Sequence, residues 1–312
     1  MRRGASGIDV PIDRTKLVSF CLKIPMTIVL DPNCTGYHQP GHPEKPNRVA
    51  RTVDLLRLQK PIALEWVTPA AVTDAVLLRG HTPEHLARLK VEAAFDADTP
   101  WHPGIEDHAR RSVGAALRAM ELAASGEPAF ALMRPPGHHA ERERAMGFCY
   151  YSSMALAVLE AKVRGLGPIA VFDFDVHHGN GTEDILKNVE GVVFGSVHQG
   201  DTYPGTGQAD VGSNCFNRPL PGGTPRAVWL RTLETTWQRL LATQPRLIGI
   251  SAGFDAYNKD PLANGTLERE DFNLLGQWAR ASGIPTFVIL EGGYSLDLPD
   301  LVLHFLLGWE GK

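Results

Sequence analysis

Acidic and imidazole side chains recur at every second residue of one short stretch, residues 171–182 (VFDFDVHHGNGT). On an extended chain Asp173, Asp175 and His177 would share one face, and the apolar residues between them would take the other. Burying two carboxylates and an imidazole on one face is costly unless those groups meet a cation or each other. The stretch therefore predicts a polar site at the carboxyl end of a strand, where open α/β sheets usually place their ligands.

A metal site is the chemistry that these side chains suit best. Three protein ligands suffice for a catalytic divalent metal and leave a position open for water. Asp175, His177 and Asp255 would make a carboxylate–imidazole–carboxylate set, which accepts Zn²⁺, Fe²⁺ or Co²⁺. Alone, Asp255 would more commonly be a cap or turn aspartate, and Asp175 with His177 could form a salt-bridged strand end. The position of Asp255 in SAGFDA, beyond an apolar strand, favours the metal.

Two adjacent histidines follow a Pro-Pro-Gly turn and could serve as general acid and base. The alternative for His138 and His139 is a surface pair or an adventitious metal site. Asp173 and Asn180 could be the partners that fix the two rings. Because Asp173 is charged and Asn180 is neutral, the two imidazoles should differ in pKa. His139, beside Asn180, would then be the better general base at neutral pH.

A phenol follows two glycines near the end of the chain. Tyr294, in EGGY, could donate a hydrogen bond to an oxyanion opposite a metal. The alternative is a tyrosine packed after a strand.

The elements that must position these groups alternate between strand-like and helix-like runs, which predicts an α/β fold with a mainly parallel sheet flanked by helices. Each reactive cluster follows a strand, so the clusters should meet at one edge of the sheet. Strands are expected at 27–31, 129–133, 169–174, 192–198, 247–251 and 286–290, helices at 48–58, 83–94, 105–125, 147–165, 183–189, 224–243, 268–282 and 296–309, and a loop at 199–223.

Composition narrows the class of protein. The 312 residues are 43% hydrophobic with a net charge of −4, which fits a globular domain and argues against a nucleic-acid binder. The four cysteines form no CxxC pair, which favours a reduced, cytoplasmic protein, and no apolar run suits a membrane span. We expect one catalytic domain over 26–312, after an extension over 1–25 that is disordered or reflects a true start at Met26. No feature indicates an oligomeric state.

Several motifs together resemble the zinc-dependent histone deacetylase superfamily, which includes bacterial histone deacetylase-like amidohydrolases, acetoin-utilisation proteins and acetylpolyamine amidohydrolases. They stand in order along the chain: RPPGHHA (134–140), GFC (147–149), DFDVHHGNGT (173–182), YPGTG (203–207), SAGFDA (251–256), DPL (260–262) and EGGY (291–294). The stretch HPEKPNR (42–48), Asn180 and EGGY are more similar to the class II branch than to class I.

The resemblance implies a three-layer arginase–deacetylase fold and a deacetylase activity that uses a metal and water. It implies Zn²⁺ on Asp175, His177 and Asp255, with His139 as general base and acid, His138 as its electrostatic neighbour and Tyr294 as oxyanion donor. It also implies an acyl-lysine tunnel lined by Gly147, Phe148, Tyr203 and Leu262, with Asp98 gripping the substrate. A structural K⁺ is expected against oxygens of Asp173, Asp175, His177, Ser196 and Val197.

Other readings remain open. Arginases share the fold but bind two Mn²⁺ ions and carry an aspartate where this chain has Gly179. A non-catalytic acyl-lysine binding module is a further alternative, although some weakly active relatives replace the tyrosine that this chain keeps. The substrate is an acetylated lysine, a peptide or a small acetylamine such as an acetylpolyamine. Glu44 and Asp98 are candidate acids at the tunnel mouth, and the short loop at 199–203 suggests an open entrance.

Overall fold

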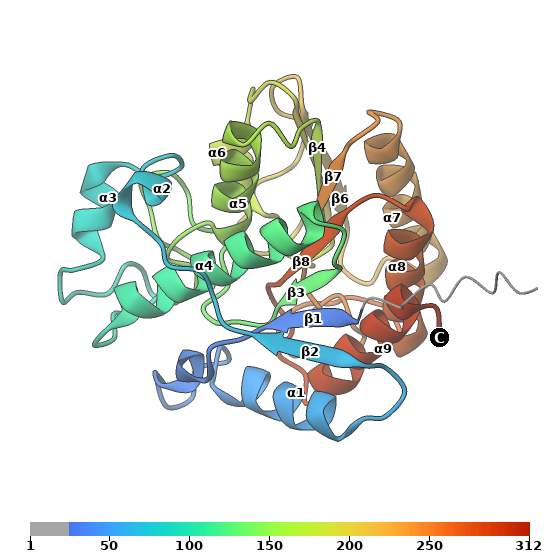
Figure 1. Ribbon diagram of the computed structural model, residues 1–312, viewed down its shortest axis with the longest axis horizontal. Helices are drawn as coiled ribbons and strands as arrows, with labels where there is room; N and C mark the ends of the chain where they lie inside the picture. The colour runs from blue at the N-terminus through green and yellow to red at the C-terminus, as the bar shows by residue number, and fades with distance from the viewer. Residues whose placement is uncertain (1–24) are drawn as a thin grey trace, which may run out of the picture.

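The computed structural model describes residues 25–312, so the expected extension lies outside the described residues except at residue 25. Eight strands form one sheet in the order β2-β1-β3-β8-β7-β4-β5-β6, and neighbouring strands are parallel (Figure 1). The strands are β1 Met26–Val29, β2 Leu64–Val67, β3 Ala129–Ala131, β4 Ile169–Asp173, β5 Val192–Gln199, β6 Cys215–Leu220, β7 Leu247–Ala252 and β8 Thr286–Leu290.

Helices cover both faces of the sheet, so the expected three-layer α/β architecture is confirmed. Helices α4 (Ile105–Ala124) and α5 (Ser153–Val163) pack on one face, and α1 (Asn47–Leu58), α7 (Arg226–Leu241), α8 (Arg269–Ser282) and α9 (Leu298–Glu310) lie on the other (Figure 1). The short helices are η2 Pro32–Thr35, α2 Asp74–Leu77, α3 Pro83–Arg88 and α6 Asn180–Leu186. No helix among the described residues is long and apolar enough to cross a membrane.

Phe172 of β4 and Phe174, just after the strand, point to one face of the sheet, as the alternation predicts. The Phe172 ring lies 5.4 Å from Trp237 of α7, and the Phe174 ring lies 5.9 Å from Phe305 of α9. Both phenylalanines are almost fully buried, and each such side chain contributes about 2 kcal/mol to folding. Asp173, between them, points to the opposite face, where it meets His138. The helix layer thus fixes which way the polar face of β4 points.

Two edge strands were missed by the sequence prediction. Strand β6 lies inside the expected loop at 199–223 and contains Pro219, which an edge strand tolerates because one side of it needs no ladder hydrogen bonds. Strand β2 is short and only partly buried, so its sequence lacks the apolar run of a central strand. Strands β2 and β6 are the two edge strands of the sheet.

Two expected helices are shorter than their sequence patterns. Helix α3 stops at Arg88 rather than continuing to 94, because that guanidinium donates to Ala93 O and Ala94 O and stacks on Phe95. Helix α5 begins at Ser153 instead of 147. The residues before it form a turn in which Phe148 has φ 69, a left-handed conformation that costs a non-glycine residue energy and that clusters at functional sites.

Candidate active site

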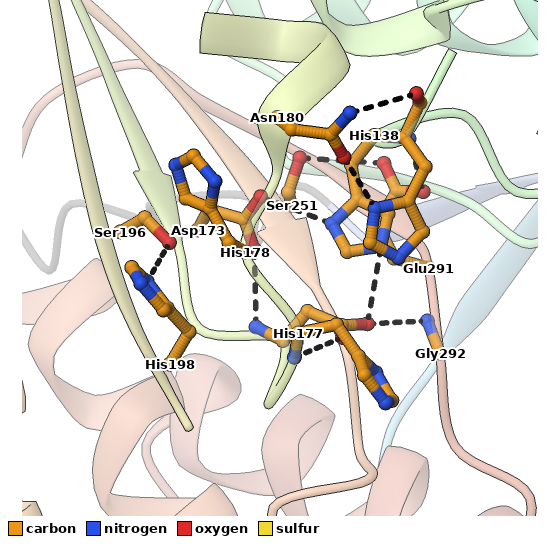
Figure 2. A network of polar contacts seen from close by, with 12 residues as sticks. His138, Asp173, His177, His178, Asn180, Ser196, His198, Ser251, Glu291 and Gly292 are labelled. Atoms are coloured by element: carbon orange, nitrogen blue, oxygen red, sulfur yellow. Dashed lines mark hydrogen bonds and ion pairs between the residues drawn. The ribbon is translucent and has the colours of Figure 1, made fainter. Parts of the chain in front are cut away.

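The carboxyl ends of β4 and β7 bring the predicted metal ligands together. His177 Nδ1 lies 3.2 Å from Asp175 Oδ1 and 3.1 Å from Asp255 Oδ2 (Figure 2 shows this region). Both carboxylates are fully buried, and possible ligand atoms of the three residues lie within 4.8 Å of one another. The backbone also holds them, since Gly292 N–H donates to Asp175 and Val176 N–H donates to Asp255.

This set fits a divalent cation. Two buried carboxylates repel each other where the dielectric is low. Burial, followed by the charge of Asp175, raises the pKa of Asp255. Within the described residues, the hydrogen-bond partners of both carboxylates are the His177 ring and backbone N–H groups, with no lysine or arginine. A cation bound by these oxygens and His177 would offset the negative charge, and the donor set suits Zn²⁺ or Fe²⁺.

The adjacent histidines stand in different electrostatic environments beside this set. His138 Nδ1 lies 3.2 Å from Asp173 Oδ2, and its Nε2 lies 3.8 Å from Asp175 Oδ2. Burial alone would lower the pKa of His138, but the charges of Asp175 and Asp173 outweigh it and raise the pKa to about 10. Burial, followed by His138 and His177, holds the pKa of His139 well below its usual value. The two shifts run in opposite directions, as the partners Asp173 and Asn180 predict.

The hydrogen bonds of Asn180 determine which nitrogen of His139 carries a proton. Asn180 Nδ2 donates to Glu141 Oε1 at 2.8 Å, so the amide oxygen must face His139. His139 Nδ1, 2.7 Å from that oxygen, therefore donates, and its Nε2 is left with a free lone pair. Sequence reasoning missed Glu141, although it directly follows the RPPGHHA motif.

A second missed carboxylate joins the histidine turn to the EGGY turn. Glu291 Oε2 accepts hydrogen bonds from Gly137 N–H at 2.7 Å and from His138 N–H at 3.1 Å. Its other oxygen accepts from the Ser251 hydroxyl at 3.3 Å. Glu291 stands immediately after β8 and is fully buried. It thereby fixes the distance between the strand that leads to Tyr294 and the turn that carries the histidines.

A cavity of about 250 Å³ opens beside His177, one of the candidate metal ligands. It is lined by seven expected residues (Asp98, His139, Gly147, Phe148, Tyr203, Leu262 and Tyr294), by the expected ligand His177, and by His42, Pro43 and Thr202, which were not expected there. The Phe148 ring lies 5.7 Å from that of Tyr294, and the Tyr203 ring 5.1 Å from that of His139. Aromatic rings thus wall a passage that reaches His139.

His42 connects two loops at the rim of this cavity. Its Nδ1 accepts from Glu44 N–H at 3.1 Å, so its Nε2 carries the proton and donates to Asp98 O at 3.1 Å. The ring also packs edge-on against Phe148 at 4.7 Å. Its signal in the sequence is the HPEKPNR stretch, which indicates the family but not this contact.

The expectation that Glu44 is an acid at the tunnel mouth is wrong. Glu44 is 4% exposed, and its carboxylate accepts from Arg134 Nε and Nη2, both at 2.6 Å. Arg48 Nη1, at 3.3 Å, and the Tyr37 hydroxyl, at 3.0 Å, complete its surroundings. Glu44 is therefore an ion-pair centre inside the protein, whereas Asp98, the other candidate, does line the cavity.

Gly179 lies so close to Asp173, the partner of His138, that it leaves no room for a side chain. A Cβ added there would lie 2.2 Å from Asp173 Oδ2, closer than any real contact. An aspartate at this position would have to displace Asp173 from His138. The site as folded therefore provides no room for the extra aspartate of a two-metal arginase.

The residues expected around K⁺ lie side by side. Asp173 pairs with Ser196 in the parallel register of β4 and β5, and both Ser196 and Val197 are buried. Ser196 Oγ lies 2.9 Å from His198 Nδ1, next to the end of β4 (Figure 2).

Together, fold and site define an α/β protein in which a candidate metal set and a histidine pair share the carboxyl edge of a parallel sheet. Residues 42–306 match the model of the histone deacetylase domain. The chain belongs to that family, and its sheet and flanking helices have the arginase–deacetylase fold.

Named relatives agree with this assignment. A histone deacetylase-like amidohydrolase of Pseudomonas aeruginosa is 35% identical over 288 residues, which cover 83% of this chain and 75% of the relative. The crystal structure of the HDA15 HD domain superposes with a TM-score of 0.86 at 30% identity, covering 92% of this chain and 91% of that one. The crystal structure of an acetylpolyamine aminohydrolase from Burkholderia pseudomallei superposes with a TM-score of 0.84 at 25% identity. The match covers 92% of this chain and 99% of that one. The chain is thus similar to enzymes of both names.

Proposed function

We propose that this protein is a zinc-dependent deacetylase that removes acetyl groups from acetylated lysine side chains of peptides or from similar small amines. The observation that carries the proposal is the buried set of Asp175, His177 and Asp255 at the base of the cavity that Tyr294 and His139 line. The domain would span residues 26–312. The separate buried thiols Cys34, Cys149 and Cys215 support a cytoplasmic location.

The proposed mechanism uses the chain's own residues around the metal. A divalent metal held by the three ligands would supply Lewis acidity toward the amide carbonyl and lower the pKa of water. His139 accepts the proton of the attacking water through Nε2, because its Nδ1 proton is directed at Asn180. Asp173 holds His138 in the charged form next to that ring. The proton is then returned to the leaving amine.

Tyr294 completes the proposed mechanism by donating its hydroxyl hydrogen to the developing oxyanion. Its neighbours Phe148 and Tyr203 exclude water from the passage in which the acyl-lysine chain would lie. A K⁺ ion, held by oxygens at the ends of β4 and β5, would stabilise the strand ends that carry Asp175 and His177.

Replacement of one hydroxyl tests the oxyanion role. Tyr294→Phe should retain one metal per chain yet lose about 10²–10³ in kcat on an acetyl-lysine coumarin peptide. Deacetylation at the wild-type rate would refute the role. Metal analysis of the purified protein tests the choice of Zn²⁺ over Fe²⁺ or Co²⁺.

Acetylpolyamines are the second candidate substrates, and the carboxylate of Asp98 at the cavity rim is the observation that favours them. A cationic amine at the far end of the substrate would be attracted there. A parallel kinetic screen of acetylated peptides against N-acetylputrescine and N-acetylspermidine compares the two classes. A kcat/KM at least about tenfold higher for the polyamines, worth about 1.4 kcal/mol, would favour them.

A further inference from the structure

One buried carboxylate outside the metal set touches both the catalytic turn and the cavity wall. Asp260, in the loop after β7, is 7% exposed. Its Oδ2 accepts hydrogen bonds from Tyr294 N–H at 2.6 Å and from Ser295 N–H at 3.0 Å. Its Oδ1 accepts from Leu262 N–H at 3.0 Å. A single side chain therefore binds three backbone donors in two separate loops.

The turn that carries Tyr294 needs such an anchor. Strand β8 ends at Leu290, so the residues beyond it have left the sheet ladder. Gly292 packs so closely on the metal ligands that a Cβ there would lie 2.0 Å from Asp255 Oδ2. The chain then turns away from the ligands, and the N–H groups of Tyr294 and Ser295 face Asp260. Leaving these two N–H groups without an acceptor would be unfavourable, so this carboxylate favours one position of the turn.

The ring of Tyr294 is held separately from its backbone. It lies 5.7 Å from the Phe148 ring, and Arg48 Cζ lies 4.7 Å above it. These contacts restrict the tilt of the ring, while Asp260 fixes the backbone from which the ring projects. Since Leu262 lines the same cavity, the distance between the phenol and this wall depends on Asp260 as well.

We propose that Asp260 is a positioning residue, which sets the place of the Tyr294 hydroxyl and of the Leu262 wall through three backbone hydrogen bonds. The inference rests on the oxyanion role of Tyr294 in the proposed function. Asp260 touches no reacting atom in this account and acts through Tyr294. A displacement of about 1 Å in a catalytic group can cost about 10²-fold in rate.

The test is a double-mutant cycle between Asp260 and Tyr294 in the metal-loaded enzyme. Asp260→Ala, which removes all three acceptors, should lower kcat about 100-fold in the wild-type background and less than about threefold in Tyr294→Phe. Asp260→Asn keeps the shape but has one acceptor oxygen, so it should lose about tenfold. Metal content should stay at one per chain in every variant.

Hydrogen exchange gives a readout that does not depend on activity. In either Asp260 variant the amides of Tyr294 and Ser295 should exchange faster than in wild type, at pH and temperature held equal. Asp297→Asn is the matched control, because Asp297 accepts from the Tyr257 hydroxyl near this turn but touches neither amide. It should leave kcat and both exchange rates unchanged.

The outcomes separate this inference from the proposed function. Three results would each overturn the role of Asp260. One is an equal loss of kcat on Asp260 replacement in the wild-type and Tyr294→Phe backgrounds, and another is a wild-type kcat in the Asp260 variants. The third is unchanged amide exchange at Tyr294 and Ser295 in those variants. If Asp260→Ala does not fold, Asp260→Asn carries the same comparisons. Full activity of Tyr294→Phe would overturn the oxyanion role, and the inference with it. An inactive Tyr294→Phe beside fully active Asp260 variants would overturn the inference alone.

Discussion

Replacing Glu44 by glutamine tests the ion pair that holds the HPEKPNR loop against the histidine turn. Glu44 accepts two hydrogen bonds from Arg134, which is itself fully buried and precedes the Pro-Pro-Gly turn. Glutamine keeps the shape of the side chain but removes its charge. Its amide nitrogen would also point a donor at the guanidinium, so one of the two hydrogen bonds would become a repulsive contact.

The expected loss of stability follows from the pKa of this carboxyl. Burial alone would raise the pKa of Glu44, but Arg134 and Arg48 outweigh it and lower the pKa from 4.5 to about 2. That shift corresponds to about 3 kcal/mol of native stability at neutral pH. Leaving a buried charge unpaired typically costs about 3–5 kcal/mol. We expect Glu44→Gln to lose about 3–4 kcal/mol at pH 7, a large part of the stability of an ordinary domain.

The pH dependence of this loss has a definite sign. The folded-state pKa lies below the unfolded one, so the stabilisation is present above the unfolded value of 4.5 and disappears as the pH falls toward about 2. The difference in unfolding free energy between wild type and Glu44→Gln should therefore be constant from pH 7 to about 5 and shrink below about 4.5.

Urea unfolding followed by circular dichroism at several pH values measures this difference. Glu65→Gln is the control, because Glu65 is exposed on β2, and its effect should stay within about 0.5 kcal/mol. Wild-type stability of Glu44→Gln at pH 7, or a difference as large at pH 3 as at pH 7, would refute the reasoning.

Three further predictions concern the site itself. Asn180→Asp places a charge beside His139 and should move the acidic limb of the kcat/KM pH profile about 1–3 pH units toward alkaline pH; an unshifted limb would contradict His139 as the base. Gly179→Ala should lower metal affinity, measured by competition with a chelator, because its Cβ collides with Asp173; unchanged affinity would show that the collision is relieved. Asp98→Asn should raise KM for N-acetylspermidine more than for a neutral acetylated peptide, and equal changes would argue against charge recognition.

Local sequence patterns predicted the site residues that lie at the end of a strand or in the few residues after it. The alternation around Asp173 predicted that its side chain and those of Phe172 and Phe174 point to opposite faces of the sheet. The convergence of strand ends predicted that Asp255 would meet His177 across 78 positions of sequence. In each case the periodicity of a parallel sheet determined the geometry.

Groups whose role depends on a distant partner were not predictable in this way. Glu44 reads as a surface acid among prolines until Arg134, 90 positions away, is placed beside it. Asp260 reads as a turn aspartate, and its three backbone donors become apparent only in the fold. Strand β6 is held by its neighbour β5 rather than by its own composition. Long-range pairing is tertiary information that single-sequence patterns do not contain.

The most direct test of the central claim is a metal titration of the chelator-stripped protein, followed by acetate release from an acetylated lysine peptide. We expect no turnover without metal, and full turnover at one Zn²⁺ per chain, with no restoration in Asp255→Ala. Full activity of the stripped protein, or a requirement for two metals per chain, would contradict it.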